Sequence, residues 1–155
     1  MSRATIERLY ASLGALQADA MAACYAEDAH FEDEAFNLNG RREIGGMWRM
    51  LCQATRAKGQ AHWKIETSQV TERSAHWDAH YLFSATNRLV LNRIDATFEF
   101  NPAGLIVKQR DRFDFWRWSR QALGAPGYLL GWSGAFQNKV RAKAAGNLKA
   151  FLAKN

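Results

Sequence analysis

The sequence predicts an α+β protein in which helices cover one face of a curved, mixed or antiparallel sheet. A helical pattern opens the chain, the clearest helix follows at residues 41–57, and four long alternating segments then lie between residues 61 and 116. A run of helices followed by a meander of strands is typical of layered α+β domains. With 155 residues we expect a single domain over residues 1–155, with its core at about residues 3–118.

The first 25 residues predict two helices. Apolar residues recur at helical spacing over residues 3–17, which indicates a first helix packed on one face. Asp19 can cap a short second helix that carries Met21, Cys24 and Tyr25. Both cysteines, Cys24 and Cys52, are expected in the core as free thiols, since a cytosolic setting argues against a disulfide.

A short strand and a long helix come next. Residues 29–36 alternate, which predicts a strand on which Phe31 and Asp33 share a face. Residues 41–57 carry an apolar stripe at helical spacing, and the helix is expected to end at Lys58-Gly59, a cation followed by a stop glycine. The sheet is expected to curl around this long helix.

Four further strands are predicted at residues 61–70, 74–86, 87–100 and 105–116. The last two are joined by the turn 101–104, Asn-Pro-Ala-Gly, with proline at its second position and glycine at its fourth. Residues 119–155 are expected to form a glycine-rich loop and then a basic amphipathic helix over residues 135–153.

Charge is distributed unevenly along the chain. The net charge is +6, all fifteen acids lie at or before Asp114, and seven basic residues with no acid follow from Arg117 onward. A basic tail can attract nucleic acid or an anionic membrane. Because the basic residues spread around the polar face of the last helix, we interpret them as a solvated face and expect no nucleic-acid partner.

The sequence indicates neither a membrane span nor an export signal. No apolar run approaches the roughly 20 residues that a transmembrane helix needs, and the N-terminus lacks the apolar region of a signal peptide. We therefore expect no membrane partner and a cytoplasmic location.

Two motifs carry a resemblance to a known family. Residues 25–36, YAEDAHFEDEAF, and residues 40–51, GRREIGGMWRML, followed by four long strands, resemble the nuclear-transport-factor-2-like superfamily. Within it, the chain is similar to the SnoaL-like branch, relatives of polyketide cyclases and ketosteroid isomerase. Residues 111–124 and 129–132 are similar to a largely uncharacterised SnoaL-like subgroup. The resemblance implies a cone-shaped, cystatin-like curved sheet with an apolar pocket on its concave face, and homodimers formed through its outer face.

The resemblance also implies site residues. Asp33 matches the general base of ketosteroid isomerase, whereas Leu9 matches its oxyanion tyrosine, with Tyr10 one step off that face. The second oxyanion donor matches either Asp95 or Ala96, depending on the register. Strand alternation favours Ala96 inward and Asp95 outward, which predicts that the isomerase oxyanion hole is absent.

The last strand places an acid on an apolar face. Val107, Gln109, Asp111, Phe113 and Phe115 alternate onto one side, and burying an unpaired acid there is costly, which suggests a pocket wall. We predict Asp33 and Asp111 as catalytic carboxylates, and if they converge, repulsion raises one pKa. Alternatively, Asp33 bonds the backbone of the following turn, and Asp111 forms an ion pair with Arg49 or another helix arginine.

The remaining candidates would bind the ligand. The predicted substrate-binding residues are Tyr25, Trp48, Trp77, Tyr81, Asn92, Phe98, Gln109 and Phe113. The sequence His76-Trp77-Asp78-Ala79-His80 invites a metal interpretation, but its histidines stand about 13 Å apart along a strand and cannot easily converge. We predict no metal and no cofactor.

These observations predict a protein with a pocket for a small apolar molecule. Its activity would be that of a cofactor-independent isomerase, cyclase or dehydratase using carboxylate acid–base chemistry on a small carbonyl compound. Asp33 or Asp111 would be the base, and Gln109 and Asn92 would orient the carbonyl oxygen. The alternative is a non-catalytic small-molecule-binding or dimeric accessory protein of the same fold.

Overall fold

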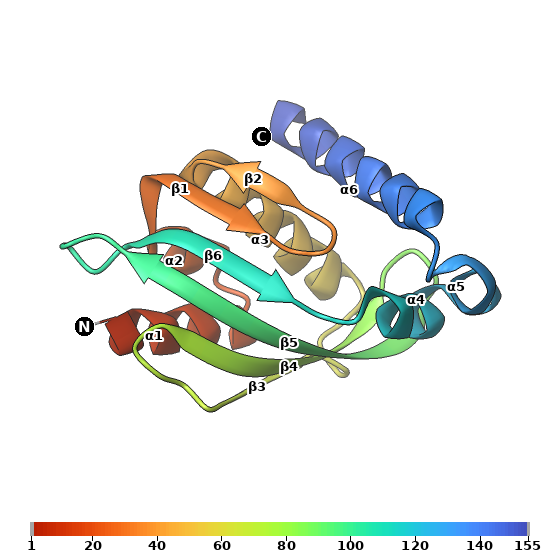
Figure 1. The fold of residues 1–155 in the computed structure, drawn as a ribbon, viewed down its shortest axis with the longest axis horizontal. Helices are drawn as coiled ribbons and strands as arrows, with labels where there is room; N and C mark the ends of the chain where they lie inside the picture. Colours follow the sequence, from red (N-terminus) through yellow and green to blue (C-terminus); the bar gives the residue numbers. More distant parts are fainter. Residues whose placement is uncertain (1, 155) are drawn as a thin grey trace.

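The protein is built on one six-stranded sheet, seen in a computed structural model that describes residues 2–154 (Figure 1). Its spatial order is β2-β1-β6-β5-β4-β3. The pair β1–β6 is parallel and every other neighbouring pair is antiparallel. The strands are β1 (Tyr25–Glu32), β2 (Asn37–Asn39), β3 (Lys64–Ser68), β4 (Ser74–Phe83), β5 (Arg88–Phe100) and β6 (Ile106–Arg112). The predicted α+β class with a curved mixed sheet is confirmed.

Helices cover one face of this sheet. They are α1 (Ser2–Gly14), α2 (Ala18–Ala22) and α3 (Arg41–Ala57). Their apolar residues form one buried cluster with the inner side chains of the strands, including Ile6, Leu13, Ile44, Ile94 and Ile106. Helix α3 has the predicted bounds, and its apolar stripe is the reason that it packs into the curve of the sheet.

The side chains of β5 point inward and outward as predicted. Asn92, Ala96 and Phe98 are buried on the inner face, whereas the Asp95 side chain is 77% exposed on the outer face. Ala96 therefore occupies the inward position, and Asp95 cannot contribute to an interior site. The β5–β6 turn also forms as predicted, with the Gly104 amide donating to the Asn101 carbonyl at 2.9 Å.

Two boundaries near the N-terminus differ from the sequence prediction. Tyr25 begins β1 instead of ending a helix, and the strand predicted at residues 29–36 spans 25–32. Asp33 ends it by accepting hydrogen bonds from the amides that follow. Asp19 lies inside α2, whose N-cap residue is Gln17. The parallel pairing of β1 with β6, 80 residues away, is a tertiary contact that local patterns do not encode.

The C-terminal segment differs more. Strand β6 ends at Arg112, and Asp114 caps a helix by accepting a hydrogen bond from the Arg117 amide at 3.0 Å. The predicted strand end and glycine-rich loop are instead helices α4 (Phe115–Leu123) and α5 (Ala125–Leu130). Helix α6 (Gly134–Lys154) forms as expected. It runs beside α3 (Figure 1), where the Leu152 and Leu148 side chains lie against Gly46.

Among the described residues, the chain has no helix that is both long and apolar enough to span a membrane.

The packing of α5 on α4 gives a stability prediction. A Cβ atom on Gly127 would overlap the main chain of Ser119, whereas one on Gly146 in α6 would meet nothing within 4 Å. Gly127→Ala should therefore lower the free energy of unfolding by about 1–3 kcal/mol. The matched control Gly146→Ala should raise it by roughly 0.5–1 kcal/mol through helix propensity. Urea denaturation of both variants checks this, and equal effects would contradict the α4–α5 contact.

Candidate active site

Parallel pairing of β1 and β6 brings two sequence-distant acids together. Phe31 lies opposite Gln109, and Glu32 lies opposite Arg110. Asp33 and Asp111 are one residue further along each strand and point to the same, inner side. Burial raises the pKa of Asp111 most, and the negative charge of Asp33 adds to that rise.

A chain of buried hydrogen bonds ends on Asp111. The indole N–H of Trp48, from α3, donates to the Tyr25 hydroxyl at 3.2 Å. The Tyr25 O–H donates to Oε1 of Gln109 at 2.6 Å, and the Gln109 amide donates to Oδ1 of Asp111 at 2.9 Å. Each donor in this series of hydrogen bonds has one acceptor. The bonds therefore fix both the orientation of the Gln109 amide and the position of Asp111.

Asp111 is an unusual carboxyl group because it is only 2% exposed. Burial raises its pKa from 3.8 to about 8, with the Asp33 charge adding to the rise and the Gln109 hydrogen bond and Arg110 opposing it. The expected ion pair with Arg49 is not formed, and within residues 2–154 no basic side chain pairs with Asp111. Asp111 is therefore mostly protonated at neutral pH.

Asp33 combines a structural contact with a shifted pKa. Its Oδ1 accepts hydrogen bonds from the amides of Ala35 and Phe36, both at 2.7 Å, which confirms the turn-forming interpretation. Burial nevertheless raises its pKa to about 6, against the lowering effect of those two amides and of Arg110. At pH 7 Asp33 is mostly ionised, and its second oxygen takes no part in these bonds.

Two buried donors near the acids have no partner. The hydroxyl of Tyr10 and the indole N–H of Trp77 form no hydrogen bond within the described part of the chain. Their rings lie 5.2 Å apart, and the Asp111 charge helps to raise the Tyr10 pKa, after burial. Tyr10 was predicted to lie off the inner face, yet it is 4% exposed and faces the core. A buried donor without an acceptor costs free energy unless a ligand supplies one.

Small residues form the sheet surface beside Asp111. Ala96 on β5 lies opposite Asp111, and Ala75 on β4 lies opposite Ala96. Further along the same face, beyond the pair Trp77 and Ile94, Asn92 lies opposite Ala79, and all four are buried. Strand alternation therefore places the Asn92 amide on the same inner face as Asp111.

Helix α4 closes the end of the sheet toward which β1 and β6 run (Figure 1). The Trp118 indole donates to the Tyr81 hydroxyl at 2.9 Å, and its ring lies 5.4 Å from that of Phe83 and 6.5 Å from that of Phe113. Burial, and then the Asp33 charge, raise the pKa of Tyr81 to about 12. The predicted wall residues Tyr81 and Phe113 therefore contact a helix that the sequence did not reveal.

Neither of two hollows at the surface of the described residues is lined by Asp33 or Asp111. One, of about 310 Å³, lies over the outer side of β5 and β6 near Glu99 and Lys108. The other, of about 650 Å³, lies beside α4. Of the ten predicted site residues, Phe98 lines the smaller hollow, and its ring lies between those of Tyr10 and Phe100.

The histidines on β4 are occupied by ion pairs on the outer face. His76 contacts Asp95 and Asp78, both at 2.8 Å, and His80 contacts Glu66 at 3.0 Å. Across the described residues, no three His, Cys, Asp or Glu side chains are grouped so that they could hold a metal. The pairs of His76 with Asp95 and of His80 with Glu66 link β4 to its two neighbouring strands, whereas the pair of His76 with Asp78 lies within β4.

The chain matches the SnoaL-like domain family over residues 6–109, two thirds of its length. It belongs to the SnoaL-like family. The match ends at Gln109, before the second acid of the pair and before α4, α5 and α6. Comparison with curated proteins gives no match.

Solved structures of similar fold agree with this assignment. A proposed polyketide cyclase from Silicibacter sp. TM1040 has 19% identity and a TM-score of 0.58, over 78% of this chain and 94% of that one. A second, from Pseudomonas putida KT2440, has 15% identity and a TM-score of 0.58, over 79% and 98%. An epoxide hydrolase/cyclase-like enzyme of pyran ring formation in salinomycin has 15% identity and a TM-score of 0.56, over 73% and 90%. At these identities the likeness concerns the fold.

The buried Asp111 gives a stability prediction with a defined sign. Its pKa is raised from 3.8 to about 8 in the folded protein, so its contribution to stability is fully present below about pH 4 and is lost as pH rises toward 8. Asp111→Asn cannot ionise and should lose this dependence. Relative to wild type, the variant should gain several kcal/mol between pH 4.5 and pH 8, at about 1.4 kcal/mol per pKa unit.

Urea denaturation of wild type and Asp111→Asn at both pH values measures this difference. Asp28→Asn, on the exposed part of β1, is the control for losing a carboxylate. An equal stability difference at pH 4.5 and pH 8 would show that Asp111 is ionised at an ordinary pKa.

Proposed function

We propose that this SnoaL-like protein is a cofactor-independent enzyme that moves a proton on a small apolar carbonyl compound, as an isomerase, cyclase or dehydratase. The observation that carries the proposal is the pair Asp33 and Asp111, whose pKa values of about 6 and about 8 lie on either side of neutrality. Two carboxyl groups with separated pKa values can act as base and acid at the same pH.

Asp33 is the base in this proposal. Its pKa of about 6 leaves it ionised at pH 7 while keeping it more basic than an ordinary aspartate. Oδ1 is held by the Ala35 and Phe36 amides, which leaves Oδ2 to accept a proton from the carbon beside the carbonyl group. A base whose pKa lies near the operating pH is the most effective.

Asp111 is the acid. Its Oδ1 accepts from Gln109, so in the neutral form its proton is available on Oδ2 for the carbonyl oxygen. Both ends of the Gln109 amide are already bonded, to Tyr25 and Asp111. Gln109 is therefore better described as positioning Asp111 than as binding the substrate oxygen.

Two further donors can stabilise negative charge on that oxygen. The Tyr10 hydroxyl and the Trp77 indole are buried without partners, and a carbonyl oxygen would supply the missing acceptor. Asn92 lies on the same inner face. Tyr25, Trp48, Tyr81, Phe98 and Phe113 would form the apolar wall. This arrangement replaces the oxyanion hole that Leu9 and Ala96 cannot form.

The named activities of structural neighbours agree with the proposal. Two neighbours are proposed polyketide cyclases, and a third is an epoxide hydrolase/cyclase-like enzyme. Ring closure on a polyketide begins with proton transfer at or near a carbonyl or hydroxyl oxygen, which is the chemistry that a split carboxylate pair supports. We also propose that the protein works as a cytoplasmic homodimer, as the family resemblance implies.

A binding protein without chemistry is the second candidate. One observation favours it: neither surface hollow is lined by Asp33 or Asp111, and α4 covers the end of the sheet where they lie. In that role the pair would only bind the oxygen of a ligand. Native mass spectrometry of the purified protein, followed by denaturing extraction, would identify the class of any retained compound and supply a substrate for assays.

The proposal predicts a bell-shaped pH profile on a substrate found in this way. The value of kcat/KM should rise as Asp33 ionises near pH 6 and fall as Asp111 ionises near pH 8. Asp33→Asn, which still supports the turn, should lower kcat/KM by at least about a hundredfold. Asp111→Asn should remove the alkaline limb, while Asp28→Asn should change neither limb.

The same experiment distinguishes the acid–base enzyme from the binding protein. An unchanged rate in both Asp33→Asn and Asp111→Asn would exclude them as acid and base. Retained ligand with no turnover at any pH between 5 and 9 would favour the binding protein.

A further inference from the structure

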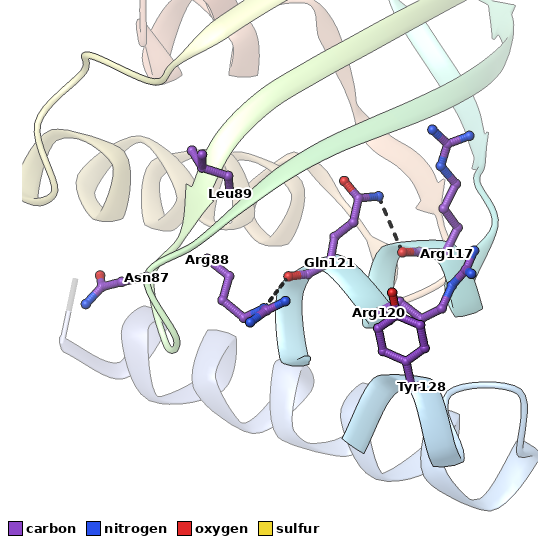
Figure 2. Close-up of a pocket in the computed structure, with 7 residues that line it drawn as sticks. All are labelled: Asn87, Arg88, Leu89, Arg117, Arg120, Gln121 and Tyr128. Atoms are coloured by element: carbon purple, nitrogen blue, oxygen red, sulfur yellow. Dashed lines mark hydrogen bonds between the residues drawn. The ribbon is translucent and has the colours of Figure 1, made fainter. Parts of the chain in front are cut away.

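The larger surface hollow lies outside the curved sheet interior and is lined by basic side chains. It has a volume of about 650 Å³ and lies between the start of β5 and helices α4 and α5. Figure 2 shows Arg88 reaching the main chain of Gln121 on one side, with Arg117, Arg120 and Tyr128 on the other. A volume of this size is in the range of small-molecule sites.

The walls of the hollow are held together by specific hydrogen bonds. The Gln121 side chain accepts from the Leu91 amide at 2.8 Å and donates to the Leu91 carbonyl at 3.1 Å. Nε of Arg88 donates to the Gln121 carbonyl at 2.8 Å, and Thr86 donates to the Ala122 carbonyl. The β4–β5 turn and α4 therefore form one unit, and the hollow is preformed.

The arginines in this hollow lack acidic partners. In the described part of the chain, none of Arg88, Arg117 and Arg120 forms an ion pair, although most other acids and bases near the sheet do. Nε of Arg120 is buried with no hydrogen-bond partner. The nearest acid along α4, Asp114, is bonded to the Arg117 amide at the helix start. Three positive charges thus share one hollow without compensation.

Apolar and aromatic groups surround these charges. The Arg120 guanidinium lies 4.3 Å from the centre of the Trp116 ring and 5.7 Å from that of Tyr128. Leu89 and Tyr128 are 62% and 59% exposed at the edge of the hollow. Stacking on the rings fixes the plane of the guanidinium and directs its N–H groups to the side.

We propose that this hollow binds an organic oxyanion, a phosphate or carboxylate group carried on an aromatic body. Planar guanidinium groups donate paired hydrogen bonds to the oxygens of both groups, which accounts for the arginines. Tyr128 and Leu89 supply apolar contact for the aromatic part. The excess of positive charge favours the doubly charged phosphate monoester over the carboxylate. The site uses none of Asp33, Asp111 or their hydrogen-bond partners, so it is independent of the proposed acid–base chemistry.

Calorimetric titration of the full chain with phenyl phosphate tests the proposal. Phenyl phosphate should bind more tightly than benzoate and than inorganic phosphate, and the neutral benzyl alcohol should not bind. Arg117→Glu should raise the Kd for phenyl phosphate at least about tenfold, since a charge-assisted pair becomes a repulsive one. Raising NaCl from about 50 to 500 mM should also raise the Kd.

Arg42→Glu is the matched control. Arg42 lies in the first turn of α3, as Arg117 does in the first turn of α4, so both substitutions place an acid at a favourable helix start, although Arg42 is exposed and Arg117 is half-buried. Within residues 2–154 the Arg117 side chain forms no hydrogen bond or ion pair that its loss would break, so the variant should remain folded, as circular dichroism would check. Arg120→Lys, which keeps the charge but loses the planar fork, should bind with an intermediate Kd.

Several outcomes would overturn the proposal. These are no saturable binding of phenyl phosphate up to about 10 mM at low salt, an equal Kd in wild type and Arg117→Glu, and equal binding of benzyl alcohol. Concentration-dependent association that Arg117→Glu abolishes would show that a second copy of the chain, and not a small anion, covers this surface.

Discussion

The parallel pairing of β1 with β6 is the contact on which the rest of the site depends. It is the one parallel pair in an otherwise antiparallel sheet. Antiparallel neighbours would have run Asp33 and Asp111 to opposite ends of the sheet, whereas parallel neighbours bring them to the same end. Burial is the largest cause of the raised pKa of both acids. The topology adds the Asp33 charge to the rise at Asp111, while the Ala35 and Phe36 amides in the local sequence lower the pKa of Asp33.

The buried polar groups near Asp111 destabilise the protein when no ligand forms hydrogen bonds with them. Asp111 has one hydrogen bond to satisfy it, and the Tyr10 hydroxyl and Trp77 indole have none. A core built only for stability would place apolar groups at these positions, because unpaired buried donors each cost about 1–3 kcal/mol. The hydrogen-bond chain from Trp48 through Tyr25 and Gln109 instead holds Asp111 in one position. Rigid support around a neutral acid is what a site for a carbonyl oxygen requires.

The sequence predicts the fold and the inner face of the strands better than it predicts the contacts. Alternation correctly puts Gln109 and Asp111 inward and Asp95 outward, because a one-residue shift would bury charges along the whole strand. It does not reveal that Tyr25 lies on a strand and bonds to Gln109, since that partner is 84 residues away. Tyr10 was assigned to the wrong face because residues 9 and 10 both lie on the wide buried stripe of α1.

The C-terminal segment shows why an alternating pattern can mislead. Residues 112–115 alternate charged and apolar side chains as a strand would, but the Asp114 carboxylate accepts from the Arg117 amide and turns the chain into α4. Helix α4 then places side chains in two positions that a strand could not provide. Its Trp118 closes the end of the sheet over the acids by bonding to Tyr81, and its opposite side carries Arg117 and Arg120 into the surface hollow.

Both features thus depend on one short helix, which Gln121 holds against Leu91 of β5 and Thr86 holds against the β4–β5 turn. A ligand that reaches the acids from that end must displace α4, and displacement would pull apart the wall that Arg88 and Gln121 form. The proposed acid–base site and the proposed anion site are therefore separate in chemistry, yet both include contacts of α4, through Trp118 in the first and through Arg117 and Arg120 in the second.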